Sequence, residues 1–175
     1  MIVKLSSDNS LRRSDIDYLG GHFNWFSRMG LKGTGSTRFI YLDGISEFDD
    51  MKTLSQDLNT VSFELLRGGL VLRFSKKNIQ KALLIRYTDI LSLTVVSQRI
   101  RKYWKGRERI VKKADITIVF GDKELVLGLS PSYYKSGIDF LSKRPIKQYC
   151  THRLNPEIIE DKNFTGWLNW LDELL

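Results

Sequence analysis

Residues 61–129 carry the strongest structural pattern in the sequence. They contain six apolar runs divided by turn residues: VSFELL (61–66), LVLRFS (70–75), ALLIRY (82–87), ILSLTVV (90–96), ADITIVF (114–120) and ELVLGL (124–129). In the first run Val61, Phe63 and Leu65 alternate with polar residues. Such period-two alternation predicts antiparallel strands with one buried face. Gly68-Gly69 predicts a tight hairpin with positive φ between the first two runs.

The segments on either side of residues 61–129 fit the same mainly β pattern. The sequence predicts seven strands, near 38–43, 61–66, 70–75, 82–87, 90–97, 110–120 and 124–129. Ser130-Pro131 then starts a helix of about residues 131–143, with Tyr134, Ile138 and Leu141 on one face. We therefore expect an α+β fold in which β-structure predominates.

Three sequence features resemble a known family. They are Tyr41-Leu42-Asp43-Gly44 on the first strand, Gly69-Leu70-Val71-Leu72 on the third, and ALLIRYTDILSL at 82–93. Together with seven strands and one closing helix, they are similar to the pleckstrin-homology-like barrel, in its bacterial and GRAM-like forms. The resemblance implies a seven-stranded antiparallel barrel over residues 38–143, capped by a helix. It leaves an N-terminal extension (1–37) and a C-terminal helical extension (144–175).

The same resemblance bears on ligands. Members that bind phosphoinositides carry a basic pair in the first hairpin loop, whereas this loop is Arg67-Gly68-Gly69, too short for such a pocket. Many members bind proteins or peptides instead. The resemblance thus implies a non-enzymatic interaction module with a protein or peptide partner.

The two extensions carry weaker signals. Residues 1–5 predict a short strand, and Ser14 predicts the N-cap of a helix with Asp17 in its first turn. Residues 30–37 look like a phosphate-binding loop, but Ser36 stands where the lysine belongs and a strand follows. A flexible Gly/Ser loop is the better interpretation. Asn155-Pro156-Glu157 predicts a second helix start.

The final segment is amphipathic. Trp167, Leu168, Leu171 and Leu175 form an apolar stripe on the helix expected there. A stripe of this size is expected to pack on the barrel or on a second copy of the chain. A homodimer through the C-terminal helix is therefore one of the expected assemblies.

Composition limits the setting and the partners. The net charge is +8, from 28 Lys and Arg against 20 Asp and Glu, which favours acidic partners, although an inert basic surface also explains it. The single Cys150 fits a reducing compartment. No apolar run approaches the roughly 20 residues of a membrane span, and the first residues lack a signal-peptide core. We expect a cytoplasmic protein, peripheral at the membrane if its partner is a lipid.

One basic segment stands out, at residues 99–113. With eight basic residues and one acid, it predicts an anion-binding ribbon at a strand turn. An anionic bilayer that takes Trp at headgroup depth is one partner for such a ribbon, and nucleic acid is a second, less favoured one. Solvated strand faces are the alternative interpretation. The candidate site residues are Arg99, Arg101, Lys102, Trp104, Lys105, Arg107 and Arg109.

Signals for catalysis or metal binding are weak. The chain has only two histidines, His22 and His152, and no local nucleophile–base motif. Cys150 and His152 lack further ligands at zinc spacing. We therefore expect no enzyme activity, no metal and no cofactor.

Overall fold

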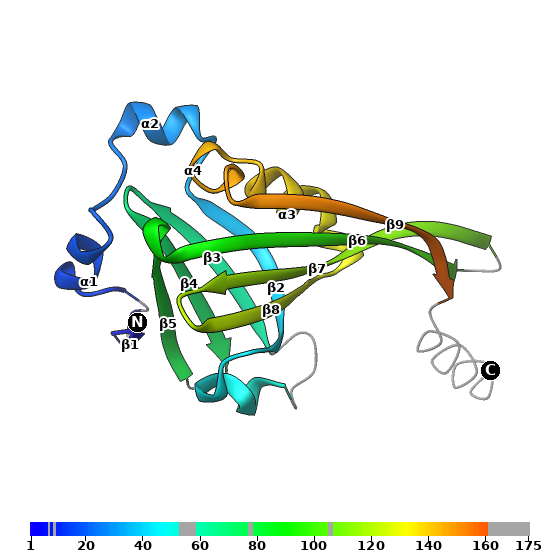
Figure 1. Ribbon diagram of the computed structural model, residues 1–175, viewed down its shortest axis with the longest axis horizontal. Helices are drawn as coiled ribbons and strands as arrows, with labels where there is room; N and C mark the ends of the chain where they lie inside the picture. The colour runs from blue at the N-terminus through cyan, green and yellow to red at the C-terminus, as the bar shows by residue number, and fades with distance from the viewer. Residues whose placement is uncertain (7, 9, 53–58, 77–78, 105–106, 161–175) are drawn as a thin grey trace.

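The computed structural model describes residues 1–6, 8, 10–52, 59–76, 79–104 and 107–160 (Figure 1). Within these residues nine strands form one sheet, in the order β1-β5-β4-β3-β2-β8-β7-β6-β9. The strands are β1 (Ile2–Lys4), β2 (Gly35–Asp43), β3 (Thr60–Leu66), β4 (Gly69–Lys76), β5 (Ile79–Arg86), β6 (Ile90–Trp104), β7 (Arg107–Phe120), β8 (Lys123–Leu129) and β9 (Cys150–Glu160). The helices are α1 (Arg13–Tyr18), α2 (Trp25–Gly30), α3 (Tyr134–Leu141) and α4 (Arg144–Lys147), with short 3-10 turns at η1 (Ser46–Met51), η2 (Tyr87–Asp89) and η3 (Pro131–Tyr133).

The mainly β class is confirmed, but the expectation of seven strands in a barrel is wrong for the described residues. The seven strands predicted for the barrel correspond to β2–β8. The short strand predicted at residues 1–5 is confirmed as β1 at one end of the sheet, and the unpredicted β9 lies at the other end. β1 pairs with the outer edge of β5, and β9 pairs with the outer edge of β6. A barrel would close by pairing β5 with β6. In the described residues these edges are paired with β1 and β9 instead, so the sheet stays open.

The predicted alternation produces the core. Val61, Phe63 and Leu65 of β3 are buried, and they face aromatic residues of the neighbouring elements. Phe63 lies 4.6 Å from Phe39 of β2 and 5.7 Å from Phe140 of α3, measured between ring centroids. The helix predicted at 131–143 is therefore confirmed as η3 and α3, and it packs on this end of the core.

A second apolar cluster covers the outer face of β3–β5. Leu5, Leu11 and Leu19 from the N-terminal segment are buried there against strand residues that point away from the main core, namely Leu66, Val71, Ala82 and Leu84. Consecutive apolar residues such as Leu65-Leu66 thus supply both faces of a strand that is covered on two sides. The N-terminal segment stabilises the sheet by keeping this outer face out of water.

The β3–β4 hairpin forms where expected, but the reason is different. Neither Gly68 nor Gly69 has a positive φ. A Cβ added at Gly69 would lie 2.3 Å from the Ile85 carbonyl oxygen, and one at Gly68 would lie 2.9 Å from that of Leu19. These glycines are therefore required by close backbone packing.

The terminal segments need two corrections. Helix α1 is capped from Arg12, whose backbone N–H donates to the Asp15 carboxylate at 3.3 Å, and not from Ser14. The helix start predicted at Asn155-Pro156-Glu157 is wrong, because these residues lie within β9, which runs parallel to β6. The helical extension expected over 144–175 thus contains a strand at 150–160. The apolar stripe at 167–175, and the dimer predicted from it, lie outside the described residues.

Candidate functional site

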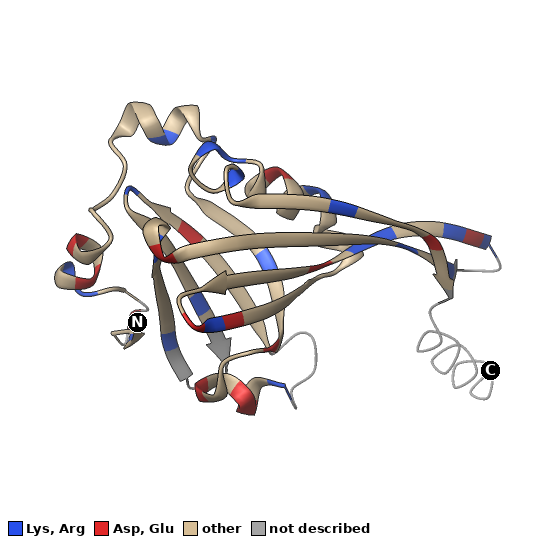
Figure 2. Cartoon of the chain, viewed as in Figure 1, with Lys and Arg blue, Asp and Glu red and all other residues tan. Residues whose placement is uncertain are grey.

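The predicted basic segment forms a projecting arm (Figures 1 and 2). We define the arm as residues 98–104 of β6, 107–113 of β7 and 154–160 of β9. β8 ends its pairing with β7 at Ala114, so the two longest strands continue past the rest of the sheet. β9 accompanies β6 as far as Arg101. Figure 2 shows that Lys and Arg are concentrated along this arm.

Strand alternation separates the arm cations onto two faces. Directly paired residues share a face, and the residues next to them point the other way. The inner face continues the core side of Val95 and Ile116 and carries Arg99, Arg101, Glu108, Ile110 and Lys112. The outer face carries Gln98, Ile100, Lys102, Arg107, Arg109, Val111 and Lys113.

The two faces differ in charge balance. On the inner face, Arg101 Nε lies 3.1 Å from Glu108 Oε1, and Arg99 donates to the Pro156 carbonyl oxygen. The outer face carries four cations along the arm, and the acid on the same face of β7, Asp115, lies at its base and accepts from Gln98 Nε2 at 3.1 Å. The structure thus divides the predicted site, because Lys102, Arg107 and Arg109 share the outer face whereas Arg99 and Arg101 do not.

The remaining predicted residues lie at the tip. Trp104 pairs with Arg107 through the backbone at the end of β6. Lys105 lies outside the described residues. Lys113 was missed by the sequence analysis, although its period-two spacing from Arg107 and Arg109 places it on the same face.

The arm has two free backbone edges, on β7 and on β9, and only one of them is continuous. β7 pairs with β6 alone from Arg107 to Lys113 within the described chain, which leaves its other edge open. The edge of β9 contains Pro156, which has no N–H, beside a register shift between Ser97 and Arg99. A continuous edge for strand pairing therefore exists on β7.

A buried polar group lies at the base of the arm. Ser97 Oγ is 2.6 Å from His152 Nε2 and 2.8 Å from the Tyr134 hydroxyl oxygen. A serine beside an imidazole is the arrangement of a nucleophile and its base. Ser97 is nevertheless 0% exposed. The group therefore joins β6 to β9 and α3, and it offers no nucleophile to a substrate.

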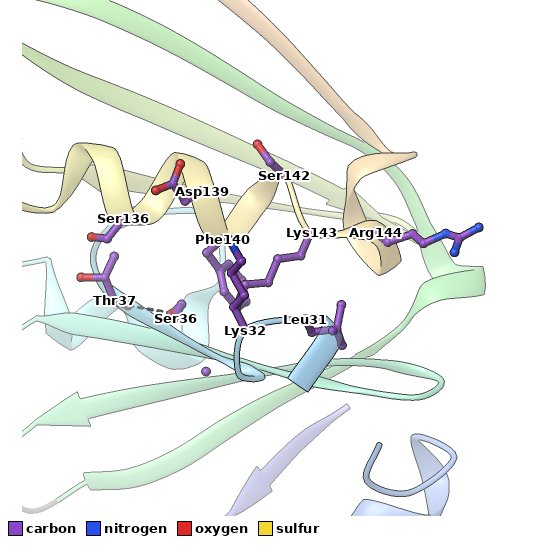
Figure 3. Close-up of a pocket in the computed structure, with 12 residues that line it drawn as sticks. Leu31, Lys32, Ser36, Thr37, Ser136, Asp139, Phe140, Ser142, Lys143 and Arg144 are labelled. Atoms are coloured by element: carbon purple, nitrogen blue, oxygen red, sulfur yellow. Dashed lines mark hydrogen bonds between the residues drawn. The ribbon is translucent and has the colours of Figure 1, made fainter. Parts of the chain in front are cut away.

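A cleft of about 700 Å³ lies between α3 and the loop that precedes β2 (Figure 3). Lys32 lines it from the loop, Ser36 and Thr37 line it from the start of β2, and Asp139 and Lys143 line it from the side of α3. The Lys143 ammonium donates to the Gly33 carbonyl oxygen at 2.7 Å. In Figure 3 the Lys143 side chain turns toward the loop, whereas that of Arg144 points away from the other lining residues.

Within the residues that the structure describes, no group of three or more His, Cys, Asp and Glu side chains is placed to hold a metal ion. No helix in the described chain combines the length and apolar character that crossing a bilayer requires. Comparisons with protein-family models, with curated proteins and with solved structures found no match to this chain.

Proposed function

We propose that this chain is a non-enzymatic interaction module of pleckstrin-homology-like type that binds an acidic, extended segment of a protein partner. The antiparallel run β2–β8, followed by α3 packed on β2, supports the pleckstrin-homology-like assignment. The observation that carries the binding proposal is the free edge of β7 from Arg107 to Lys113. We place the protein in the cytoplasm, where a free Cys150 is stable.

The edge supplies affinity through the backbone. Its unpaired N–H and C=O groups can accept one more strand, as in other complexes formed by strand addition. At about 3.3 Å per residue, residues 107–113 offer an edge roughly 20 Å long. A partner segment of similar length in an extended conformation fits this edge.

The side chains supply selectivity. Arg107, Arg109 and Lys113 point to the outer face along the edge, with Val111 on the same face between Arg109 and Lys113. An added strand with Asp or Glu at alternate positions places its carboxylates beside these cations. The same cations repel the identical edge of a second copy, as charged residues on edge strands commonly do. The edge therefore favours an acidic partner over self-association.

An anionic membrane and nucleic acid remain alternative partners for the same cations. The exposed Ile110 of β7 lies on the inner face, away from Arg107, Arg109 and Lys113, whereas the exposed Ile159 of β9 pairs with Ile100 and shares their face. A bilayer surface would favour apolar and basic groups on one face. Nucleic acid would bind the charge without using the backbone edge, and its affinity would fall steeply with salt.

The test uses two peptides with the same charge. One alternates Glu and Thr, and the other has the same sequence with an N-methyl group on every internal backbone nitrogen, so that neither of its edges can donate. Strand addition predicts that the N-methylated peptide binds at least about tenfold more weakly, because it cannot complete the ladder. Equal affinity for both peptides would show a purely electrostatic contact and would contradict the proposal.

A further inference from the structure

Helix α2 presents an unusual surface. Trp25, Phe26 and Met29 are 66%, 78% and 60% exposed, and no residue of this helix is buried. The Trp25 and Phe26 rings contact each other edge to face at 5.1 Å between centroids. Asn24 caps the helix by accepting from the Ser27 backbone N–H at 2.8 Å, which fixes the turn that carries these side chains. Clustered exposed aromatic and Met side chains mark an interaction surface.

Basic groups surround this apolar cluster. Arg28 lies in the last turn of α2, and Lys32 follows the helix by two residues. Lys32 also lines the cleft described above, together with Lys143. Aromatic side chains beside Lys and Arg are typical of segments that lie in the interface of an anionic bilayer.

We propose that α2 docks on an anionic phospholipid bilayer, with Trp25, Phe26 and Met29 inserted and a lipid phosphate held in the adjacent cleft. Charge complementarity supports a bilayer as the occupant. When Trp25, Phe26 and Met29 insert, the adjoining Arg28 and Lys32 meet the anionic headgroup layer. The bilayer is a different partner from the acidic peptide proposed above. In Figure 1 α2 lies at the upper left, and the arm extends away from it to the right, so both partners can bind together.

The cleft has features suited to a phosphate group. An ammonium group has three N–H donors, and Lys143 uses one of them on the Gly33 carbonyl, which leaves two for a ligand. Burial lowers the pKa of Lys143, because its ammonium group lies partly out of water in the cleft wall. An anion bound in the cleft would favour the charged form of this group. A Cβ at Gly30 or Gly35 would meet no atom within 4 Å. Packing therefore does not require these glycines, and they leave room for a headgroup beside the backbone.

Vesicle sedimentation tests the proposal. Wild-type protein is expected to sediment with phosphatidylcholine vesicles that contain phosphatidylserine and to stay in solution with phosphatidylcholine alone. The double variant Trp25→Ser/Phe26→Ser should lose binding by about tenfold or more, because two large apolar side chains no longer leave water. The double variant Arg28→Glu/Lys32→Glu should also bind anionic vesicles at least about tenfold more weakly, because it removes the attraction to the headgroups. The control Lys4→Glu/Lys123→Glu, which reverses two exposed cations on β1 and β8, should bind vesicles as the wild type does.

Fluorescence gives an independent readout. Lipids brominated on their acyl chains should quench the wild-type tryptophan emission on binding. Trp25→Phe should still bind but lose most of that quenching. The proposal would be overturned if the wild type failed to bind anionic vesicles or if the α2 variants bound undiminished. It would also be overturned if Trp25→Ser/Phe26→Ser dissociated a dimer in sedimentation equilibrium, since a second copy would then cover the patch.

Discussion

Ser97 Oγ lies 2.6 Å from His152 Nε2, and this contact ties the edge strand β9 to the base of the arm. Ser97 also pairs with the Tyr134 hydroxyl of α3, so one buried hydroxyl joins three elements. Each partner belongs to a different part of the sequence, at positions 97, 134 and 152. The position of β9 beside β6 therefore depends on a polar contact as well as on the ladder between them.

Replacing Ser97 with Ala should lower the free energy of unfolding by about 0.5–1.5 kcal/mol, because its hydroxyl no longer contacts the exposed His152 and the half-buried Tyr134. Urea unfolding followed by circular dichroism measures this change. Ser132→Ala, at an exposed position of η3, is the control and should stay within about 0.5 kcal/mol of the wild type. If both variants unfolded like the wild type, the contact would have no structural role.

The reactivity of Cys150, the first residue of β9, tests whether this strand is held in place. Cys150 is the single cysteine of the chain, half-buried at the start of β9, and burial raises the pKa of its thiol. Alkylation proceeds through the thiolate, so at pH 8.5 iodoacetamide should react more slowly with Cys150 than with a cysteine in an unstructured peptide. His152→Ala should increase the rate by loosening β9. An equal rate for the protein and the peptide would show that β9 does not protect its first residue.

The β3–β4 hairpin gives a steric prediction. Gly69→Ala should destabilise the fold by about 3 kcal/mol or more, because the new Cβ would overlap the backbone of β5 at Ile85. Gly30→Ala is the matched control, with open space around its Cβ, and should change the stability by less than about 1 kcal/mol. Thermal unfolding of both variants makes the comparison. Similar melting temperatures would contradict the close approach of β4 and β5.

Local sequence patterns predicted the buried strand faces and the start of the helix that follows the last predicted strand. Alternation at Val61, Phe63 and Leu65 identified a buried face, and Ser130-Pro131 located the start of η3 and α3. β9 escaped prediction because Asn155-Pro156-Glu157 carries a helix-start signal. Its strand conformation comes from pairing with β6, more than 50 positions earlier in the chain. Edge pairing of this kind is a tertiary effect that outweighs local propensity.

The candidate site was predictable in composition but not in geometry. The basic content of residues 99–113 is visible in the sequence, whereas the division into two faces requires the β6–β7 register. The open edge at Arg107 depends on where β8 ends, at Leu129. The exposed cluster of Trp25 and Phe26 was missed, because two adjacent aromatic residues on a six-residue helix do not indicate whether their side chains are buried or exposed until the packing is known.

The measurement that tests the proposed function most directly is fluorescence anisotropy with the labelled, unmethylated Glu-Thr peptide. Wild type is compared with Arg107→Glu/Arg109→Glu/Lys113→Glu and with the control Lys4→Glu/Lys135→Glu/Lys147→Glu, which makes the same charge change away from the arm. We predict that the arm variant binds at least about tenfold more weakly, while the control stays within about threefold of the wild type at physiological salt. Equal losses in both variants would show a non-specific charge effect and would contradict binding at the β7 edge.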